Sequence, residues 1–80
     1  MEKRIGIIGV VIKERLSAAP KVNEMLCKFG ELVVGRIGLP CRERGVSVIG
    51  LIVEADTDEL GALTGKLGMI EGVRVKSLMV

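Results

Sequence analysis

The chain has 80 residues, 12 of them basic and 10 acidic, which is enough for one small domain spanning residues 1–80. Because its charge is nearly balanced and it has a single aromatic residue, it lacks the basic patch and the stacking platform of nucleic-acid-binding proteins, and we expect no direct contact with nucleic acid. It has no histidine and only two cysteines, which argues against the common nucleophile pairs and His/Cys metal cages, so we predict no catalytic residue, no metal site and no cofactor.

The first predicted element is a strand over residues 5–12, IGIIGVVI, because this run is β-branched and too short for a stable helix. An apolar run so near the N-terminus also resembles a secretory signal. We reject that interpretation because the run holds two glycines and ends at Lys13-Glu14-Arg15 instead of a small-residue cleavage site. No segment approaches the roughly 20 apolar residues of a membrane-spanning helix, so we expect a cytoplasmic protein without membrane contact.

A helix is predicted next, with Ser17 as its N-cap, Pro20 in its first turn and Gly30 as its stop. Its apolar residues recur at helical spacing, namely Val22, Met25, Leu26 and Phe29. Residues 32–39, LVVGRIGL, form the second predicted strand, and residues 40–45, PCRERG, form a polar turn.

The third predicted strand covers residues 46–53, VSVIGLIV. Asp56 followed by Glu59 is a capping-box pattern, which predicts the start of a second helix. The inner face of this helix is expected to hold Leu60, Leu63, Thr64 and Leu67. A last strand is predicted over residues 73–80, where basic residues alternate with valines.

The two halves of the chain echo one another, because residues 8–12, IGVVI, match residues 49–53, IGLIV. Two strand–helix–strand units joined by a hairpin define the α+β, ferredoxin-like βαββαβ fold. Right-handed crossovers then predict a four-stranded antiparallel sheet of order 4-1-3-2 with both helices on one face. The charged strand residues Arg36, Arg74 and Lys76 fall on the predicted edge strands, where positive charge discourages unwanted pairing.

Both central strands are apolar on both of their faces, whereas a sheet covered by helices on one side should alternate apolar with polar residues. An uncovered apolar face on the order of a few hundred Å² is typical of an interaction surface. We therefore predict a homo-oligomer, either a dimer or a tetramer. The candidate interface residues are Ile5, Ile7, Ile8, Val10, Val48, Ile49, Leu51 and Ile52. The alternative is that these strands are apolar simply because they are central.

A second group of candidate residues, for contact with an anionic ligand or a partner, lies in residues 35–45. It comprises Arg36, Cys41, Arg42 and Arg44. The alternative, which we favour, is that the arginines keep the edge strand soluble. Arginines beside Cys41 favour a thiolate, so a redox or iron-sensing thiol is a further hypothesis, set against an inert loop thiol. The two distant cysteines make neither a C-x-x-C motif nor a cluster ligand set.

The segment from Gly35 to Gly68 resembles the small bacterial proteins called iron-only hydrogenase system regulators. The runs 42–47, RERGVS, and 60–68, LGALTGKLG, carry most of the resemblance. Residues 4–6, RIG, and 21–23, KVN, extend it over nearly the whole chain. The name of that family comes largely from genes that lie near hydrogenase maturation genes in anaerobes.

The resemblance implies a domain similar to ACT-type regulatory domains and to the metal-sensing domain of the nickel-responsive repressor. Those relatives assemble through their sheets, but the repressor senses nickel through histidines, which this chain lacks, so no metal site is carried over. The implied function is a non-enzymatic regulatory module, linked to iron-only hydrogenase expression or maturation, that senses a small ligand or binds a protein partner as an oligomer. The alternatives are a thiol-based redox sensor or small enzyme using Cys41, and a direct DNA-binding regulator.

Overall fold

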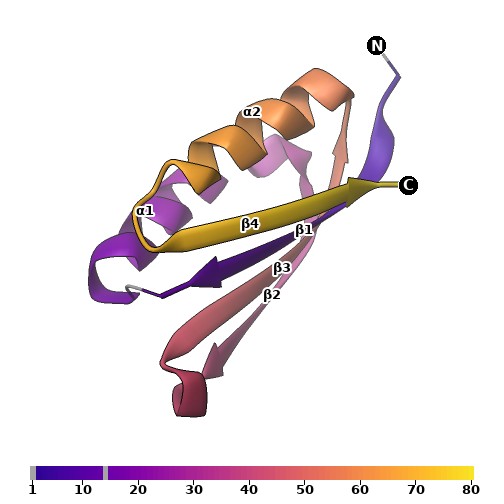
Figure 1. Cartoon of the computed structure of the whole chain (residues 1–80). Coiled ribbons are helices and arrows are strands. Elements are labelled where there is room, and N and C mark those ends of the chain that lie inside the picture. Colours follow the sequence, from indigo (N-terminus) through magenta and orange to yellow (C-terminus); the bar gives the residue numbers. More distant parts are fainter. Residues whose placement is uncertain (1, 14) are drawn as a thin grey trace.

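The computed structural model describes residues 2–13 and 15–80, without the side chains of Arg15 and Arg42. Within these residues, four strands form one antiparallel sheet, and two helices cover one of its faces (Figure 1). The strands are β1 (Arg4–Ile12), β2 (Val33–Cys41), β3 (Val46–Ala55) and β4 (Val73–Met79). The helices are α1 (Arg15–Lys28) and α2 (Thr57–Gly68). Short 3-10 turns at Gly30–Leu32 and Arg42–Arg44 flank β2.

The strand order is β2-β3-β1-β4, which confirms the order predicted from the sequence, read from the opposite edge. The central strand β1 pairs with β3 over its whole length, from Arg4 opposite Ala55 to Ile12 opposite Ser47. The edges are β2 and β4, so the predicted placement of the basic strand residues on edge strands is also confirmed.

The hydrophobic core lies between the sheet and the helices. Every second residue of the central strands points into it, and the inner stripes of both helices meet those residues from the other side. Its fully buried large side chains are Ile8, Val10, Ile12, Val22, Leu51, Val53, Leu63 and Leu67. Each of these stabilises the fold by about 1.5–3 kcal/mol through its removal from water.

The start of α2 follows the capping box predicted from the sequence. The Glu59 backbone N–H donates to Asp56 Oδ1 at 2.8 Å, and the Asp56 backbone N–H donates to Glu59 Oε1 at 2.9 Å. Two donors that the helix itself leaves unpaired are thereby satisfied.

The start of α1 differs from the prediction. The helix begins at Arg15, so Ser17 lies inside it and is not the N-cap, and Pro20 lies beyond the first turn. The buried stripe explains the difference, because Ala18 is 1% exposed and lies four residues before the buried Val22. The helix must therefore already be formed at Ala18 for both residues to face the sheet.

The turn between β2 and β3 is shorter than predicted, because Pro40 and Cys41 belong to β2. The chain reverses through Arg42–Arg44 and Gly45. Gly45 has a φ of 67°, a left-handed conformation that a residue without Cβ adopts without steric cost.

Candidate functional site

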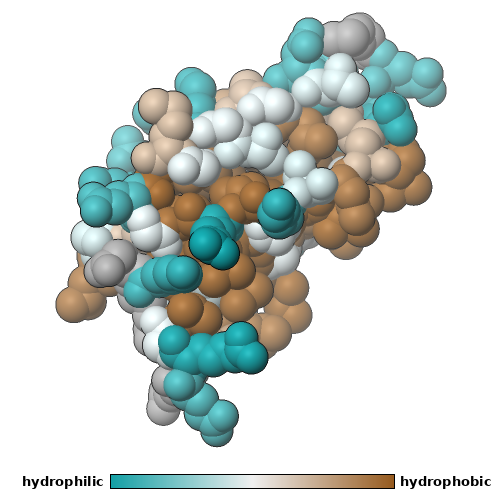
Figure 2. All heavy atoms as spheres, viewed as in Figure 1, coloured by the Kyte–Doolittle hydropathy of each residue, from teal (hydrophilic) through white to brown (hydrophobic). Residues whose placement is uncertain are grey.

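The sheet face that is turned away from the helices, called the open face here, is mostly apolar. In its middle rows Ile7 of β1 lies opposite Ile52 of β3 on one side and Leu78 of β4 on the other. Large apolar side chains remain exposed across all four strands of this face, namely Ile5, Ile7, Ile37, Leu39, Ile52 and Leu78. Figure 2 shows hydrophobic atoms gathered along the side of the sheet away from the helices.

Glycines form a depression in the middle of the open face. Gly9 of β1 lies opposite Gly50 of β3, which in turn lies opposite Ile37 of β2. Ile37 leans over this gap, because a Cβ built on Gly50 would come within 3.3 Å of Ile37 Cγ2. A neighbouring hollow of about 380 Å³ is lined mainly by aliphatic side chains and glycine, with Ile7 and Ile52 among them. The shape suits an aliphatic side chain from outside.

The structure divides the candidate interface residues between the two faces. Four of them lie on the open face: Ile5, Ile7, Val48 and Ile52. The other four point toward the helices, where they are at most 7% exposed: Ile8, Val10, Ile49 and Leu51. Placing this second set at an interface was wrong, because the helices of the same chain already cover it. Each apolar strand contributes one face to the core and one to the surface.

The second candidate group is not brought together. Arg36 lies opposite Leu51 and therefore points to the helix side, where its Nη2 donates to Asn23 Oδ1 of α1 at 3.2 Å. Cys41 lies opposite Val46, on the open-face side, and it is half-buried. Arg44 shares a shallow hollow of about 460 Å³ with Cys41. The side chain of Arg42 lies outside the part of the chain that the structure describes.

Within residues 2–13 and 15–80, no group of three or more His, Cys, Asp or Glu side chains is arranged to hold a metal ion. None of the helices described is both long and apolar enough to span a bilayer.

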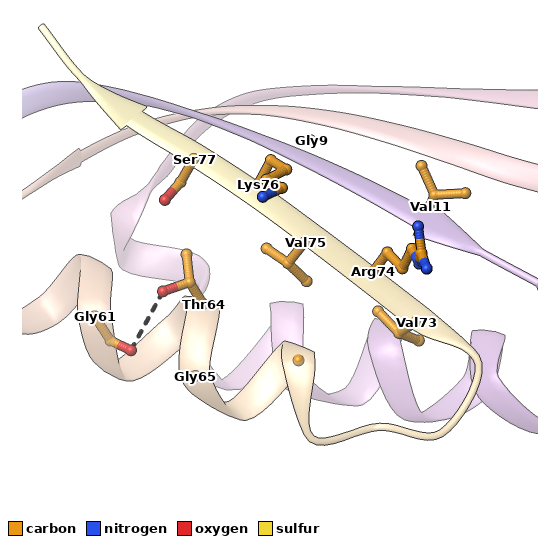
Figure 3. Close-up of a pocket in the computed structure, with 11 residues that line it drawn as sticks. Gly9, Val11, Gly61, Thr64, Gly65, Val73, Arg74, Val75, Lys76 and Ser77 are labelled. Atoms are coloured by element: carbon orange, nitrogen blue, oxygen red, sulfur yellow. Dashed lines mark hydrogen bonds between the residues drawn. The ribbon is translucent and has the colours of Figure 1, made fainter.

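A groove between β4 and α2 was missed by the sequence analysis. It has a volume of about 940 Å³, and its helix side is formed by small residues, Gly61, Thr64, Gly65 and Gly68. Figure 3 shows Val75 and Ser77 of β4 directed toward this side of the helix. Thr64 Oγ1 donates to the Leu60 backbone oxygen at 2.9 Å, which holds the hydroxyl against its own helix. The signal in the sequence was the spacing of three and four residues between these small side chains, which puts them on one helix face.

The architecture is the ferredoxin-like βαββαβ fold that ACT domains share. The ACT domain from the GTP pyrophosphokinase of Chlorobium tepidum superposes with a TM-score of 0.80 at 20% identity, covering 95% of this chain and 99% of that chain. A formyltetrahydrofolate deformylase from Pseudomonas putida shares the fold at a TM-score of 0.63 and 14% identity, but the match covers 91% of this chain and only 28% of that chain. At these identities the likeness concerns the fold alone.

The match to a protein family is more specific than the likeness in fold. Residues 4–77 match the model of the TM1266-like family, described as iron-only hydrogenase system regulators, and the chain belongs to that family. The uncharacterized protein TM1266 from Thermotoga maritima is 44% identical, with a TM-score of 0.95 over 99% of both chains. None of the curated proteins matches this chain.

Proposed function

We propose that the chain is a non-enzymatic, cytoplasmic regulatory module of an iron-only hydrogenase system. It works as a homo-oligomer joined through the open face, and it senses a small ligand or binds a protein partner. Membership of the TM1266-like family and the ACT-like fold support the regulatory part of this proposal. The apolar open face supports the oligomeric part.

The open face is the observation that carries the proposal. Ile7 and Ile52 are 45% and 47% exposed on the two central strands, and Ile37 is 62% exposed on the neighbouring edge strand; a covered face would bury such side chains. Covering apolar surface contributes roughly 25 cal/mol per Å², and an 80-residue chain has a small core of its own. A second copy of the same face would bury these side chains at about the usual 10 Å spacing of stacked sheets.

The subunit count in solution tests this proposal. Size-exclusion chromatography with light scattering should give a multiple of the 8.6 kDa chain mass for the wild-type protein. Ile52→Glu should shift the protein toward monomer, because the new carboxylate would lie in an apolar contact without a partner.

Leu16→Glu is the matched control, because Leu16 is 99% exposed on α1, away from the open face. It should leave the subunit count unchanged. A wild-type protein that runs as a monodisperse monomer at micromolar concentration would refute self-association.

A further inference from the structure

The outer edge of β4 has free hydrogen-bonding groups. On its inner side β4 pairs with β1, and the Lys13 N–H donates to the Gly72 oxygen at 2.7 Å at one end of this pair. Lys13 and Gly72 are therefore a hydrogen-bonded pair. Because opposed residues of an antiparallel pair alternate between hydrogen-bonded and non-hydrogen-bonded, the even-numbered residues of β4 direct their backbone groups to β1. Val75 and Ser77 consequently direct their N–H and C=O groups outward. Among the described residues, no backbone partner is found for these outward groups.

The opposite edge of the sheet is protected in a way that β4 is not. In β2, Pro40 has no N–H to offer, and the pairing register with β3 shifts between Val33 and Gly35. Both features discourage the addition of another strand. β4 has no proline, and its register with β1 runs without a break from Val73 to Met79.

Helix α2 leaves space next to this free edge. Gly61 and Gly65 lie within the helix and line the groove beside β4 (Figure 3). A Cβ built on either residue would meet no atom within 4 Å, so packing inside the chain does not require glycine there. Glycine within a helix is unfavourable relative to alanine, and a glycine-lined surface permits the close approach of another backbone. The space beside β4 therefore fits an added strand.

The charge next to the free edge of β4 indicates what kind of strand would bind there. Arg74 and Lys76 are exposed, and neither takes part in the ion pairs found among the described residues, which are Lys3–Glu59 and Lys28–Glu24. Both would occupy non-hydrogen-bonded positions of the new pair, where facing side chains come closest. Acidic residues opposite them would stabilise the pair, and basic ones would destabilise it.

A second copy of β4 fits this edge poorly. In an antiparallel pair of two β4 strands, the fully overlapping register places Lys76 opposite the other Lys76, and one of the two registers shifted by two residues places Arg74 opposite Lys76. Like charges directly opposite one another are unfavourable. The positive charge thus disfavours the register in which two β4 strands overlap fully, and it favours an acidic partner.

We propose that β4 is a docking site for an extended segment of a protein partner, with acidic residues at alternate positions, which joins the sheet as an additional strand beside α2. The acidic side chains face Arg74 and Lys76, and the intervening apolar side chains enter the glycine-lined groove. This inference deepens the proposed regulatory function, because it specifies how that function's protein partner is held. Main-chain bonds supply affinity in such strand addition, and alternate side chains supply specificity.

Nuclear magnetic resonance titration with synthetic peptides tests the docking site. The probes are alternating Val-Glu and Val-Lys peptides of about eight residues, long enough to span the strand. Only the Val-Glu peptide should bind, shifting the Val75 and Ser77 amide resonances and slowing their hydrogen exchange. Arg74→Glu with Lys76→Glu should reverse the preference, with a change of about two- to fivefold in affinity for each charge pair.

Ser77→Pro and Ser77→Ala form a matched pair of variants. Proline removes an outward N–H without touching the ladder to β1, so peptide binding should be lost while the circular dichroism spectrum stays native. Alanine keeps the N–H and should bind as the wild type does. Gly65→Leu should also abolish binding by filling the groove.

Several outcomes would overturn the docking site. These are failure of both peptides to bind the wild-type protein, equal binding of both, or unchanged binding to a native-like Ser77→Pro variant. A change of subunit count in Ser77→Pro would instead assign the edge to a second copy. Self-association through the open face is measured separately, so loss of this inference would leave the proposed function standing.

Discussion

Gly9 of β1 faces Gly50 of β3 directly at the centre of the sheet. Neither residue sends a side chain onto the open face, so the most central position of a mostly apolar surface is a gap. A Cβ on Gly9 would find its nearest neighbour, the Lys76 backbone oxygen, at 3.9 Å, which is an ordinary contact. The fold of the single chain therefore tolerates a side chain at Gly9, and the gap is available to a side chain of another molecule.

We predict that Gly9→Val folds normally but weakens the proposed self-association, because the new side chain would fill the gap that is open to a second copy. Light scattering across a dilution series would measure the shift. Gly38→Val is the control, since Gly38 lies opposite Ile49 on the helix side of edge strand β2, in open space. Equal effects of the two substitutions would contradict a specific role for the gap.

Ile8→Ala and Ile7→Ala separate the two faces of β1. Ile8 is fully buried under the helices, so Ile8→Ala should lower the free energy of unfolding by about 2–5 kcal/mol. Ile7 is 45% exposed in the single chain, so Ile7→Ala should reduce association more than it reduces the stability of the dissociated chain. Urea denaturation at several protein concentrations distinguishes these effects, because only association makes the midpoint depend on concentration.

Asp56→Ala should destabilise the protein by about 0.5–2 kcal/mol, because the Glu59 N–H loses its acceptor at the start of α2. Thr57→Ala changes the next residue, which is exposed and makes no side-chain hydrogen bond to the described residues, and should stay within about 0.5 kcal/mol of the wild type. Thermal unfolding measured by circular dichroism compares the two. If Thr57→Ala lowered the stability as much as Asp56→Ala, the loss could not be assigned to the Asp56 N-cap.

Gly65→Ala should raise stability by about 0.5–1 kcal/mol, because alanine is the better helix former and its Cβ meets no atom. Gly45→Ala should do the opposite and cost about 1–2 kcal/mol, because Gly45 has a φ of 67°. Chemical denaturation of both variants measures whether each substitution raises or lowers the free energy of unfolding. A loss of stability in Gly65→Ala would mean that this glycine serves internal packing after all.

Cys27 and Cys41 should differ in their rate of alkylation. Cys27 is exposed on α1, whereas Cys41 is half-buried at the end of β2, and access limits the reaction of a thiol. Iodoacetamide labelling followed by mass spectrometry of peptides should therefore modify Cys27 first. Faster modification of Cys41 would favour the thiol-based alternative that its neighbouring arginines suggested.

The sequence predicted the architecture well because the local signals agreed with one another. The capping box at Asp56 and Glu59, the β-branched runs and the repeated strand–helix–strand unit all pointed to the same fold, which the structure has. The predicted start of α1 was wrong because Ser17 followed by Pro20 also fits the beginning of a helix. Only the burial of Ala18 shows that the helix begins earlier.

The site was harder to predict, because alternation defines two faces of a strand without saying which one the helices cover. Ile7 and Ile8 are the same residue type in the same strand, so the sequence does not distinguish them. Only the three-dimensional arrangement shows that Ile8 is the buried one. Likewise Arg36 and Cys41 are close in sequence and belong to the same strand. Because side chains alternate between the two faces of a strand and these residues are an odd number of positions apart, they lie on opposite faces. The small residues of α2 were visible in the sequence, but the groove exists only once β4 lies beside them.

Pro40 and the register shift in β2 limit how far any assembly of these chains can extend. A sheet with two receptive edges can link end to end without a natural stopping point, which is the route to fibres. Here Pro40 removes one donor from the β2 edge and the register with β3 shifts near the start of that strand, so β4 is the edge better suited to an added strand. If the open faces stack as proposed, an assembly with one receptive edge per sheet would close at a defined size, and each chain could hold one partner segment.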